Sequence, residues 1–420
     1  MDFTPTARTQ ELTAKLTEFM EWHIYPNEKL FEQQQAEAEG ASRKQPQILE
    51  DLKAKAREQG LWNLFMPHSS QWSEPLSNLE YAPLAEIMGR SIMLAPEAFN
   101  CNPPDTGNME LLNMFATDEQ KEDWLKPLLD GQIRSSYLMT EPHVASSDAS
   151  GIQTRIARDG DDYVVNGRKW FITGARRERT EIYILMGVTD PDGPRHRRHS
   201  QILIPRDTPG VEITRDLHLM GYAPYETHSE VHLNDVRVPA SNLLGEEGAG
   251  FAMAQARLGP GRIHHCMRMI GLAERALELM IDRANKRTAF GGPLSEQGVV
   301  REWIADSRME IDQARLYTLY TAWLMDTVGN RQAASEISGI KVVVPNMATR
   351  VIDRAIQMHG AGGLSQDFPL ARAWVEARSM RFADGPDEVH RRGVARAELK
   401  RFEAACTPER SGLLAHLREE

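Results

Sequence analysis

The sequence has few cysteines and no excess of positive charge, and each shortage excludes a class of protein. Its three cysteines, Cys101, Cys266 and Cys406, are odd in number and far apart, so we expect a reducing compartment and no disulfide framework. The net charge of −11 is opposite to the basic footprint of a protein that binds nucleic acid or an anionic membrane.

Long hydrophobic runs are also missing. No stretch reaches the roughly 18 apolar residues of a membrane-spanning helix. The N-terminal residues 1–28 have the pattern of an amphipathic helix, without the charged start, apolar core and cleavage site of a signal peptide. We therefore expect a soluble, cytoplasmic protein with neither nucleic acid nor membrane as a partner.

What the sequence does contain is enough apolar residues, 41% of 420, to bury a large core in two or three domains. Helical spacing predicts an N-terminal α-helical domain over residues 1–134. Short β-rich runs separated by turn signals predict a middle β domain over 135–245. Helical stripes then predict a C-terminal helical-bundle domain over 246–420. Inside the β region, Asn166-Gly167 between two β-rich runs predicts a hairpin turn.

The stretch RFADGPDEVHRR, residues 381–392, contains a turn with an unexplained carboxylate. Pro386 suits the first position of a new helix, with Gly385 as its N-cap and Glu388 at the third position. Asp384 is then a turn residue that no capping rule requires. It is either a solvated turn aspartate or a residue kept for chemistry.

Five stretches stand in a fixed order on this helical, β, helical layout: YLMTEPHVASSD (137–148), NGRKWFITGA (166–175), KRTAFGGPLSEQ (286–297), QMHGAGG (357–363) and RFADGPDEVH (381–390). With this order and spacing, the chain resembles the acyl-CoA dehydrogenase family from about residue 80 to 400. It is most similar to the branch with Asp-Gly-Pro at the base, some members of which are fused to a kinase-like domain. The resemblance implies an α+β fold with an N-terminal helical domain, a middle β barrel or sandwich, and a C-terminal four-helix bundle.

The resemblance also implies a reaction: FAD-dependent α,β-dehydrogenation of an acyl-CoA to trans-2-enoyl-CoA, as in fatty acid beta-oxidation and lipid metabolism. In the family a carboxylate takes the proton alpha to the carbonyl, hydride passes to FAD, and an electron-transfer flavoprotein accepts the electrons. Asp384 falls on the family's catalytic glutamate. Some members place the base where this chain has Gly261, which offers no side chain, so Asp384 is the expected base.

The first group of expected FAD contacts lies on the TEP turn and the KWFIT strand: Tyr137, Met139, Thr140, Ser146, Ser147, Phe171 and Thr173. The two serines compete for one phosphate-contacting position, and counting back from Asp148 favours Ser147. Strand alternation places Phe171 and Thr173 on one face. Each motif also has an ordinary interpretation, as a β-turn or as a core strand.

The second group of expected FAD contacts matches segments that, in the family, work across subunits: Arg287, Phe290 and Gln297 in one loop, and Gln357, Gly360 and Gly363 in a glycine turn. Gly360 also suits a helix C-cap, and that structural role is compatible with a contact to FAD. A homodimer or homotetramer is therefore expected.

Expected substrate contacts are Arg262, near the thioester and pantetheine, and Gly385, beside the base. Arg197 and Arg198 belong to a basic loop that is either solvated or bound to a phosphate of CoA.

Two histidine patterns suggest other roles. His228, Glu230 and His232 share one strand face, as a metal site or a solvent-facing polar stripe would. The family uses no metal, so none is expected. His264 and His265 are adjacent and must point apart, and packing is the role expected for both.

Three alternative functions stay open. A flavin oxidase of the same fold, resembling nitroalkane oxidase, would react fast with oxygen. A hydroxy-acyl-CoA-processing enzyme would gain from a 4-hydroxyl group on the substrate. A non-catalytic flavoprotein scaffold would bind DNA. The sequence predicts neither acyl chain length nor the choice between dimer and tetramer.

Overall fold

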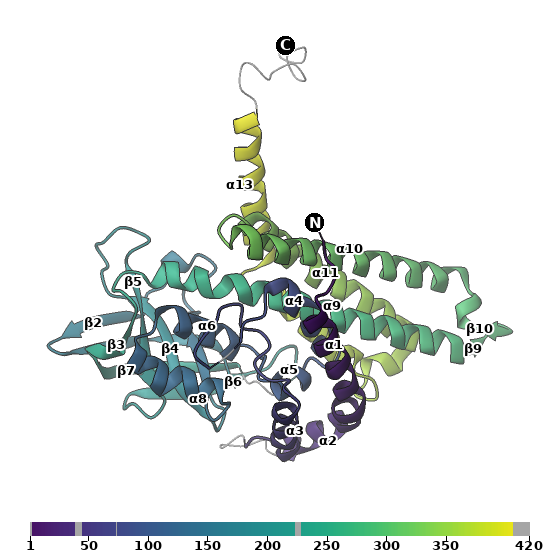
Figure 1. Ribbon diagram of the computed structural model, residues 1–420, viewed down its shortest axis with the longest axis horizontal. Coiled ribbons are helices and arrows are strands. Elements are labelled where there is room, and N and C mark those ends of the chain that lie inside the picture. The colour runs from purple at the N-terminus through teal and green to yellow at the C-terminus, as the bar shows by residue number, and fades with distance from the viewer. Residues whose placement is uncertain (1, 38–43, 73, 223–227, 406–420) are drawn as a thin grey trace, which may run out of the picture.

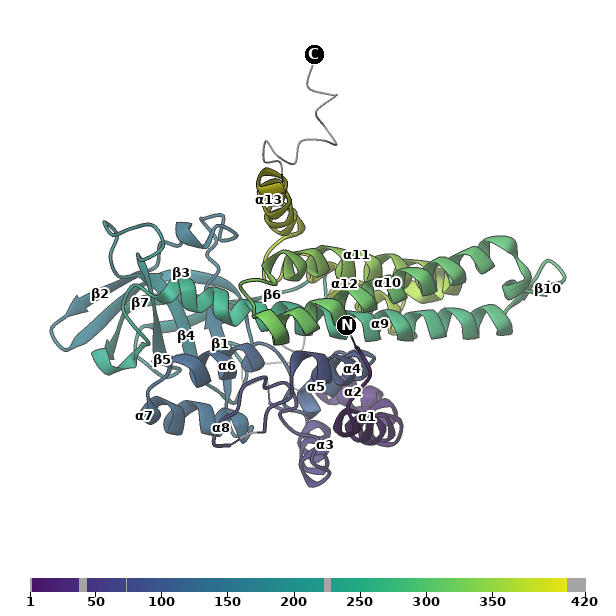
Figure 2. The ribbon, with the colours of Figure 1, turned by 45° about the horizontal axis from the view of Figure 1, so that its top comes forward.

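The computed structural model describes residues 2–37, 44–72, 74–222 and 228–405, so Cys406 and the end of the predicted third domain lie outside the described residues. The predicted helical, β, helical order is confirmed. The sheet and the long C-terminal helices lie side by side, and the N-terminal helices pack beneath them (Figures 1 and 2).

The N-terminal region is built from short helices that share one buried core with the C-terminal helices. Ser77 caps α4 by accepting a hydrogen bond from the Glu80 backbone N–H, while the Glu80 side chain bonds back to Ser77. The helices are α1 (Ala7–Phe19), α2 (Glu28–Glu37), α3 (Gln47–Glu58), α4 (Asn78–Gly89), α5 (Ala95–Ala98), α6 (Asp105–Phe115), α7 (Asp118–Gln120) and α8 (Lys126–Leu129).

The middle region is a mainly antiparallel eight-stranded sheet with its own core. The order is β6-β7-β3-β2-β4-β5-β8, and β1 pairs with β4 in parallel. The strands are β1 (Arg134–Leu138), β2 (Arg155–Asp159), β3 (Asp162–Thr173), β4 (Thr180–Val188), β5 (His199–Pro205), β6 (Val211–Leu217), β7 (His228–Pro239) and β8 (Leu243–Leu244).

The hairpin predicted at Asn166-Gly167 is wrong. Both residues lie inside β3, which runs without a break from Asp162 to Thr173. Gly167 serves close packing instead, because a Cβ there would lie 2.4 Å from the hydroxyl oxygen of Thr154. The Asn166 side chain bonds to Asp235 across the register shift with β7.

The C-terminal region is a bundle of four helices, α9 (Gly250–Lys286), α10 (Gly298–Val328), α11 (Ala334–His359) and α12 (Leu370–Ser379). A small hairpin, β9 (Thr288–Ala289) and β10 (Gly292–Pro293), joins α9 to α10 at the end remote from the sheet (Figure 1). The last helix, α13 (Asp387–Ala405), packs against α11 and projects from the bundle (Figure 2). No helix within the described ranges is long and apolar enough to cross a membrane.

Helix α4 crosses α9 at backbone contact. A Cβ at Gly271 would lie 1.8 Å from the Glu86 carbonyl oxygen, and one at Gly89 would lie 2.0 Å from that of Arg268. Only glycine allows this approach, which fixes α9 against the N-terminal region.

Candidate active site

Asp384 lies on a strained turn between α12 and α13. Its φ of +56° is in the left-handed region, which costs a non-glycine residue free energy. The Nε of Arg262 donates to its backbone carbonyl oxygen at 3.0 Å, and His390 Nε2 lies 3.2 Å from the same oxygen. Because a carbonyl only accepts, His390 carries its proton on Nε2. Two side chains therefore hold the turn, and the carboxyl is 18% exposed.

The side chain of Asp384 contacts the middle of α9. His265 Nε2 lies 3.4 Å from Asp384 Oδ2, and Arg268 lies 3.2 Å from the other ring nitrogen of His265. The packing role expected for both histidines is therefore wrong for His265. His264 points the other way and packs edge-on against Tyr81, with ring centroids 4.8 Å apart.

Charges around the carboxyl keep it ionised. Burial acts to raise the pKa of Asp384, but the contact with His265 and the charges of Arg257 and Lys341 outweigh it, so the pKa lies below its usual value. A carboxylate that is ionised at neutral pH can accept a proton.

Gly261, the position where some family members carry the base, lies next to the carboxyl of Asp384. A Cβ added to Gly261 would lie 3.3 Å from Asp384 Oδ2, its only neighbour within 4 Å. The missing side chain on α9 thus leaves room for the carboxylate from the turn. Gly385 has φ of +111°, and a Cβ added to it would lie 2.9 Å from His390 Nε2. A larger residue at this position would therefore displace that histidine.

A second buried polar cluster lies beside Asp384; the sequence did not indicate its Arg257 and Glu110, whereas its Tyr137 was an expected FAD contact. Arg257 of α9 stacks on the Tyr137 ring at 4.1 Å and donates to Asn108 at 2.8 Å. Its charge also acts on Glu110 of α6, whose two buried carboxyl oxygens have no hydrogen-bond partner within the described residues. Burial raises the pKa of Glu110 well above its usual value and the pKa of Tyr137 to about 12. The only sequence signal was a carboxylate and an arginine inside apolar helical patterns.

The TEP turn is anchored by a buried ion pair. Lys169 of β3 donates to Glu141 at 2.8 Å and to the Met139 carbonyl oxygen at 2.9 Å. Burial lowers the pKa of Lys169 to about 8. The backbone N–H of Trp170 donates to the Thr140 carbonyl oxygen at 3.0 Å, which ties the turn to the strand.

The two candidate serines differ in their surroundings. The Ser146 hydroxyl accepts from the Glu141 backbone N–H at 2.9 Å and is used within the turn, whereas Ser147 is exposed. This difference is consistent with the preference for Ser147, which stays a prediction.

Phe171 and Thr173 meet around His228. The two side chains lie on the same face of β3, as expected, with the buried Ile172 between them, although Phe171 has φ of +53° at a register shift between β3 and β7. The Phe171 ring centroid lies 6.2 Å from that of His228, and the Thr173 hydroxyl lies 3.1 Å from His228 Nδ1. The Phe171 ring is 44% exposed, so a strained backbone presents an aromatic face to solvent. Burial lowers the pKa of His228 to about 4, which keeps that ring neutral.

The second group of expected FAD residues lies at the other end of the bundle. Helix α9 has 37 residues, about 55 Å of α-helix. Asp384 contacts its first half, whereas Arg287 caps its far end, beside the hairpin that carries the 97% exposed Phe290 (Figure 1). Gln297 is the N-cap residue of α10 there. Gln357 is exposed near the end of α11, Gly360 is its C-cap with φ of +62°, and a Cβ at Gly363 would lie 2.7 Å from the Ile356 carbonyl oxygen.

The basic loop before β5 packs on the segment after the serines. Arg195 pairs with Asp148 at 2.7 Å and donates to Ser150 at 2.8 Å. Arg198 donates to the Gly193 carbonyl oxygen, whereas Arg197 is exposed.

The histidine stripe on β7 is occupied by ion pairs. Glu230 accepts from Arg168 at 2.6 Å and from Arg215 at 2.9 Å, and His232 lies 2.8 Å from the same carboxylate. His228 contacts Thr173 instead. Within the described ranges no group of His, Cys, Asp and Glu side chains could hold a metal ion.

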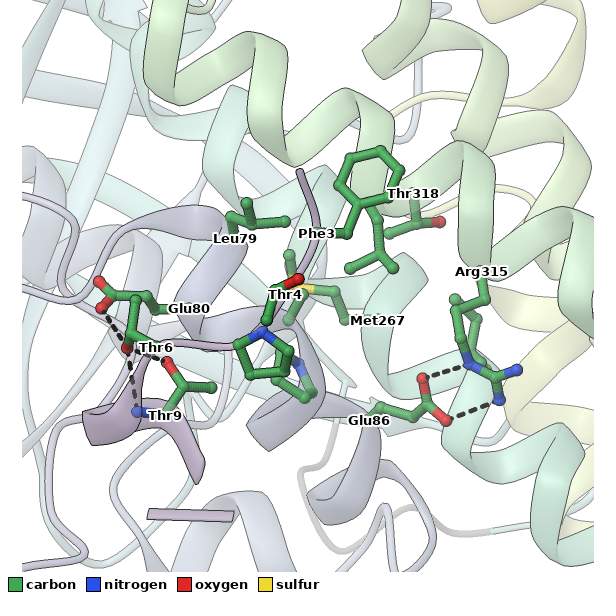
Figure 3. A pocket seen from close by; sticks show the side chains of 15 residues that line it. Phe3, Thr4, Thr6, Thr9, Leu79, Glu80, Glu86, Met267, Arg315 and Thr318 are labelled. Carbon is green, nitrogen blue, oxygen red and sulfur yellow. Dashed lines mark hydrogen bonds and ion pairs between the residues drawn. The ribbon is translucent and has the colours of Figure 1, made fainter. Parts of the chain in front are cut away.

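A pocket of about 140 Å³ lies elsewhere, between the N-terminal segment, α4, α9 and α10 (Figure 3). Its lining includes Phe3, Met267 and Thr318, with the Glu86–Arg315 ion pair at one side. None of the expected site residues lines it, so this pocket lies apart from the candidate active site.

Three family models match the chain in order: acyl-CoA dehydrogenase N-terminal domain at residues 6–132, middle domain at 136–236 and C-terminal domain at 248–399. The chain is 54% identical over 411 residues to the Mycobacterium tuberculosis protein named "Probable acyl-CoA dehydrogenase FadE2", covering 97% of this chain and all of that protein. It is 52% identical to Acyl-CoA dehydrogenase family member 10 of Mus musculus, covering 93% of this chain but 37% of that longer protein. A solved structure from Mycobacterium abscessus, assigned to the acyl-CoA dehydrogenases, has a TM-score of 0.91 and 51% identity, covering 95% of this chain and all of the other.

The chain therefore belongs to the acyl-CoA dehydrogenase family, with the N-terminal helical, middle β and C-terminal helical domains of that fold. It is an acyl-CoA dehydrogenase, an oxidoreductase. The FadE2 relative and the branch with kinase-fused members are similar to this chain over nearly all of its 420 residues. The exact domain boundaries stay a prediction.

Proposed function

We propose that Asp384 is the base of an FAD-dependent acyl-CoA dehydrogenase that converts an acyl-CoA to trans-2-enoyl-CoA and passes electrons to an electron-transfer flavoprotein. One observation carries the proposal: a partly accessible, ionised carboxylate stands on a strained turn that Arg262 and His390 hold by its backbone. Strain kept in place by neighbours is typical of functional sites. The base would take the α-proton onto a carboxylate oxygen.

The residues of β1, β3 and the TEP turn fit a flavin. Phe171 offers an exposed ring, Thr173 a hydroxyl, and Ser147 an exposed hydroxyl on a turn that the Lys169–Glu141 pair anchors. When bound, FAD accepts the hydride from the β-carbon. The chain's own contribution is to place the substrate, hold the base and exclude water.

The two groups of expected FAD residues support an oligomer. Within one chain they stand far apart along the bundle, because Tyr137 contacts Arg257 of α9, and the 30 residues from Arg257 to Arg287 correspond to about 45 Å of helix. One extended dinucleotide cannot contact both ends of such a helix. The Arg287 loop and the Gly360 turn would therefore complete the cofactor site of another subunit in a homodimer or homotetramer.

The basic loop supports a CoA contact. Arg195 is already paired with Asp148, which leaves the exposed Arg197, and Arg198 beside it, as the expected partners of a CoA phosphate. Arg262 and Gly385, next to the base, would meet the thioester end.

A hydroxy-acyl-CoA substrate is the second candidate, and the buried Glu110 carboxyl favours it. A buried polar group without a protein partner costs about 1–3 kcal/mol. A hydroxyl on the acyl chain would offset that cost if the chain passes Arg257 and Tyr137, which lie within electrostatic reach of Asp384.

The test is anaerobic. The purified protein is mixed with saturated acyl-CoAs of increasing chain length, one at a time, and the flavin spectrum is followed. We expect bleaching by one length class, which would give both the reaction and the substrate size. A flavin that none of them bleaches, or a reduced flavin that reacts fast with oxygen, would contradict a dehydrogenase.

A further inference from the structure

A chain of polar contacts leads from the interior of α9 to the carboxyl of Asp384. Arg268 is 2% exposed, donates to the Cys101 carbonyl oxygen at 3.4 Å, and lies 3.2 Å from His265 Nδ1. The opposite ring nitrogen, Nε2, lies 3.4 Å from Asp384 Oδ2. The imidazole is therefore placed between a fixed cation and the expected base.

This arrangement fixes the tautomer of His265. A guanidinium has only donors, so Nδ1 must be the acceptor and the proton must lie on Nε2, facing Asp384. Burial lowers the pKa of His265; the contact with Asp384 acts to raise that pKa, but burial and the charges of Arg268 and Lys341 outweigh it. The ring is thus a neutral N–H donor aimed at the carboxylate.

We propose that His265 is a positioning residue for the base: held as the Nε2–H tautomer by Arg268, it fixes one oxygen of Asp384 and leaves the other to take the proton. This role rests on the proposed function of Asp384. In the step itself the α C–H bond breaks and an O–H bond forms at Oδ1, while the C–H electrons remain on the substrate. His265 keeps its proton throughout.

The carboxylate has further charged and titratable neighbours on every element around it. These are Arg257, Arg262 and Cys266 on α9, Lys341 on α11, His390 on α13 and Tyr137 on β1. Lys341 donates to the Met380 carbonyl oxygen, and Arg262 and His390 hold the Asp384 backbone. Of the described neighbours, His265 has the side-chain contact with the carboxyl, so its loss should change the proton affinity of Asp384 most directly.

The sign of that change follows from charge. An N–H donor stabilises the carboxylate more than the carboxylic acid, so removing it raises the pKa of Asp384. A hydrogen bond to a charged group corresponds to a shift of about 1–2 pH units. The acid limb of the reaction should move to higher pH by that amount.

The experiment compares His265→Gln with His265→Asn in the FAD-loaded enzyme. A glutamine amide reaches the place of Nε2 and supplies a donor, whereas an asparagine amide reaches only the place of Nδ1. His264→Gln is the matched control, since that neighbouring histidine packs on Tyr81 and away from Asp384. The pH dependence of anaerobic flavin reduction is measured at low acyl-CoA concentration, where it reports the free enzyme.

We expect native, His264→Gln and His265→Gln enzymes to share an acid limb, and His265→Asn to shift upward by about 1–2 units with a lower plateau. Equal limbs in the Gln and Asn variants would overturn the inference, because a donor at the place of Nε2 would then have no effect on the proton affinity of the carboxyl. A second readout needs no turnover. Infrared titration of the enzyme labelled with ¹³C at its aspartate carboxyls, with the Asp384→Asn spectrum subtracted, measures the pKa of Asp384 directly. If no acyl-CoA reduces the native enzyme, the proposed function fails, and this titration decides the inference by itself.

Discussion

At the scale of single residues, the backbone of Asp384 matters as much as its carboxyl. An aspartate is one methylene shorter than the glutamate at this position in the family, so its reach depends on where the turn places it. The left-handed φ, the two side chains on the carbonyl oxygen and the empty position at Gly261 together bring the carboxyl to α9. The sequence left Asp384 unexplained by capping rules, and the resemblance to the family made it the expected base. It did not identify His265, because a contact between α9 and a turn more than a hundred residues later has no local pattern.

Glu110 gives a prediction at the same scale. If its carboxyl receives a substrate hydroxyl, Glu110→Leu should lower the preference for a 4-hydroxyacyl-CoA over the unsubstituted acyl-CoA of equal length by about tenfold or more. Glu110→Gln, which keeps a polar group, should retain most of the preference. The measurement is the ratio of flavin reduction efficiencies for the two substrates. An unchanged ratio in the Leu variant would show that the carboxyl does not read the acyl chain.

At the scale of elements, α9 organises the site. Arg257, Gly261, Arg262, His265 and Arg268 all belong to it. Helical periodicity predicted this helix well, since its apolar stripe faces the bundle core. The hairpin at Asn166-Gly167 was predicted wrongly because the same pair also suits a strand, where Gly167 allows Thr154 to approach. Local turn chemistry cannot distinguish these two uses of glycine.

The crossing of α4 and α9 gives the prediction for this scale. Gly271→Ala places a methyl carbon 1.8 Å from a backbone carbonyl oxygen, so the helices must move apart. We expect a loss of about 1–3 kcal/mol in the free energy of unfolding and a lower thermal midpoint. Gly298→Ala, in α10 with no atom within 4 Å of the new Cβ, is the control and should be neutral or stabilising. Equal midpoints for the two variants would mean that the crossing tolerates displacement.

At the scale of the whole molecule, the expected cofactor residues form two separate sets. The domain order could be predicted from the hydrophobic periodicity of each region, and the turn at Asp384 from the Gly385-Pro386 pair, because these signals are local. The arrangement of the cofactor residues in space could not, since Tyr137 contacts Arg257 near the start of α9, whereas Arg287 caps the far end of that helix, although both Tyr137 and Arg287 were expected to meet FAD. The separation is a consequence of helix length, and a second subunit is the simplest way to join the two sets.

The prediction for this scale concerns retention of FAD. Arg287→Ala should lower the flavin content per protomer after gel filtration, because the loop loses its expected contact with the cofactor of a neighbouring subunit. Lys286→Ala is the matched control: it is exposed, adjacent and paired only with Asp282 among the described residues. Light scattering on the same samples gives the oligomeric state. A native monomer with full flavin, or full retention in the Arg287 variant, would contradict the shared site.

The most direct test of the central claim is the flavin reduction rate of Asp384→Asn in a single anaerobic turnover with the acyl-CoA that bleaches the native enzyme. Asparagine keeps the size and the left-handed preference of the turn residue and removes only the proton acceptor. Asp384 as the base predicts unchanged FAD content and acyl-CoA affinity, with reduction slower by about 10²–10⁴-fold. Reduction at a near-native rate would contradict it and place the base elsewhere.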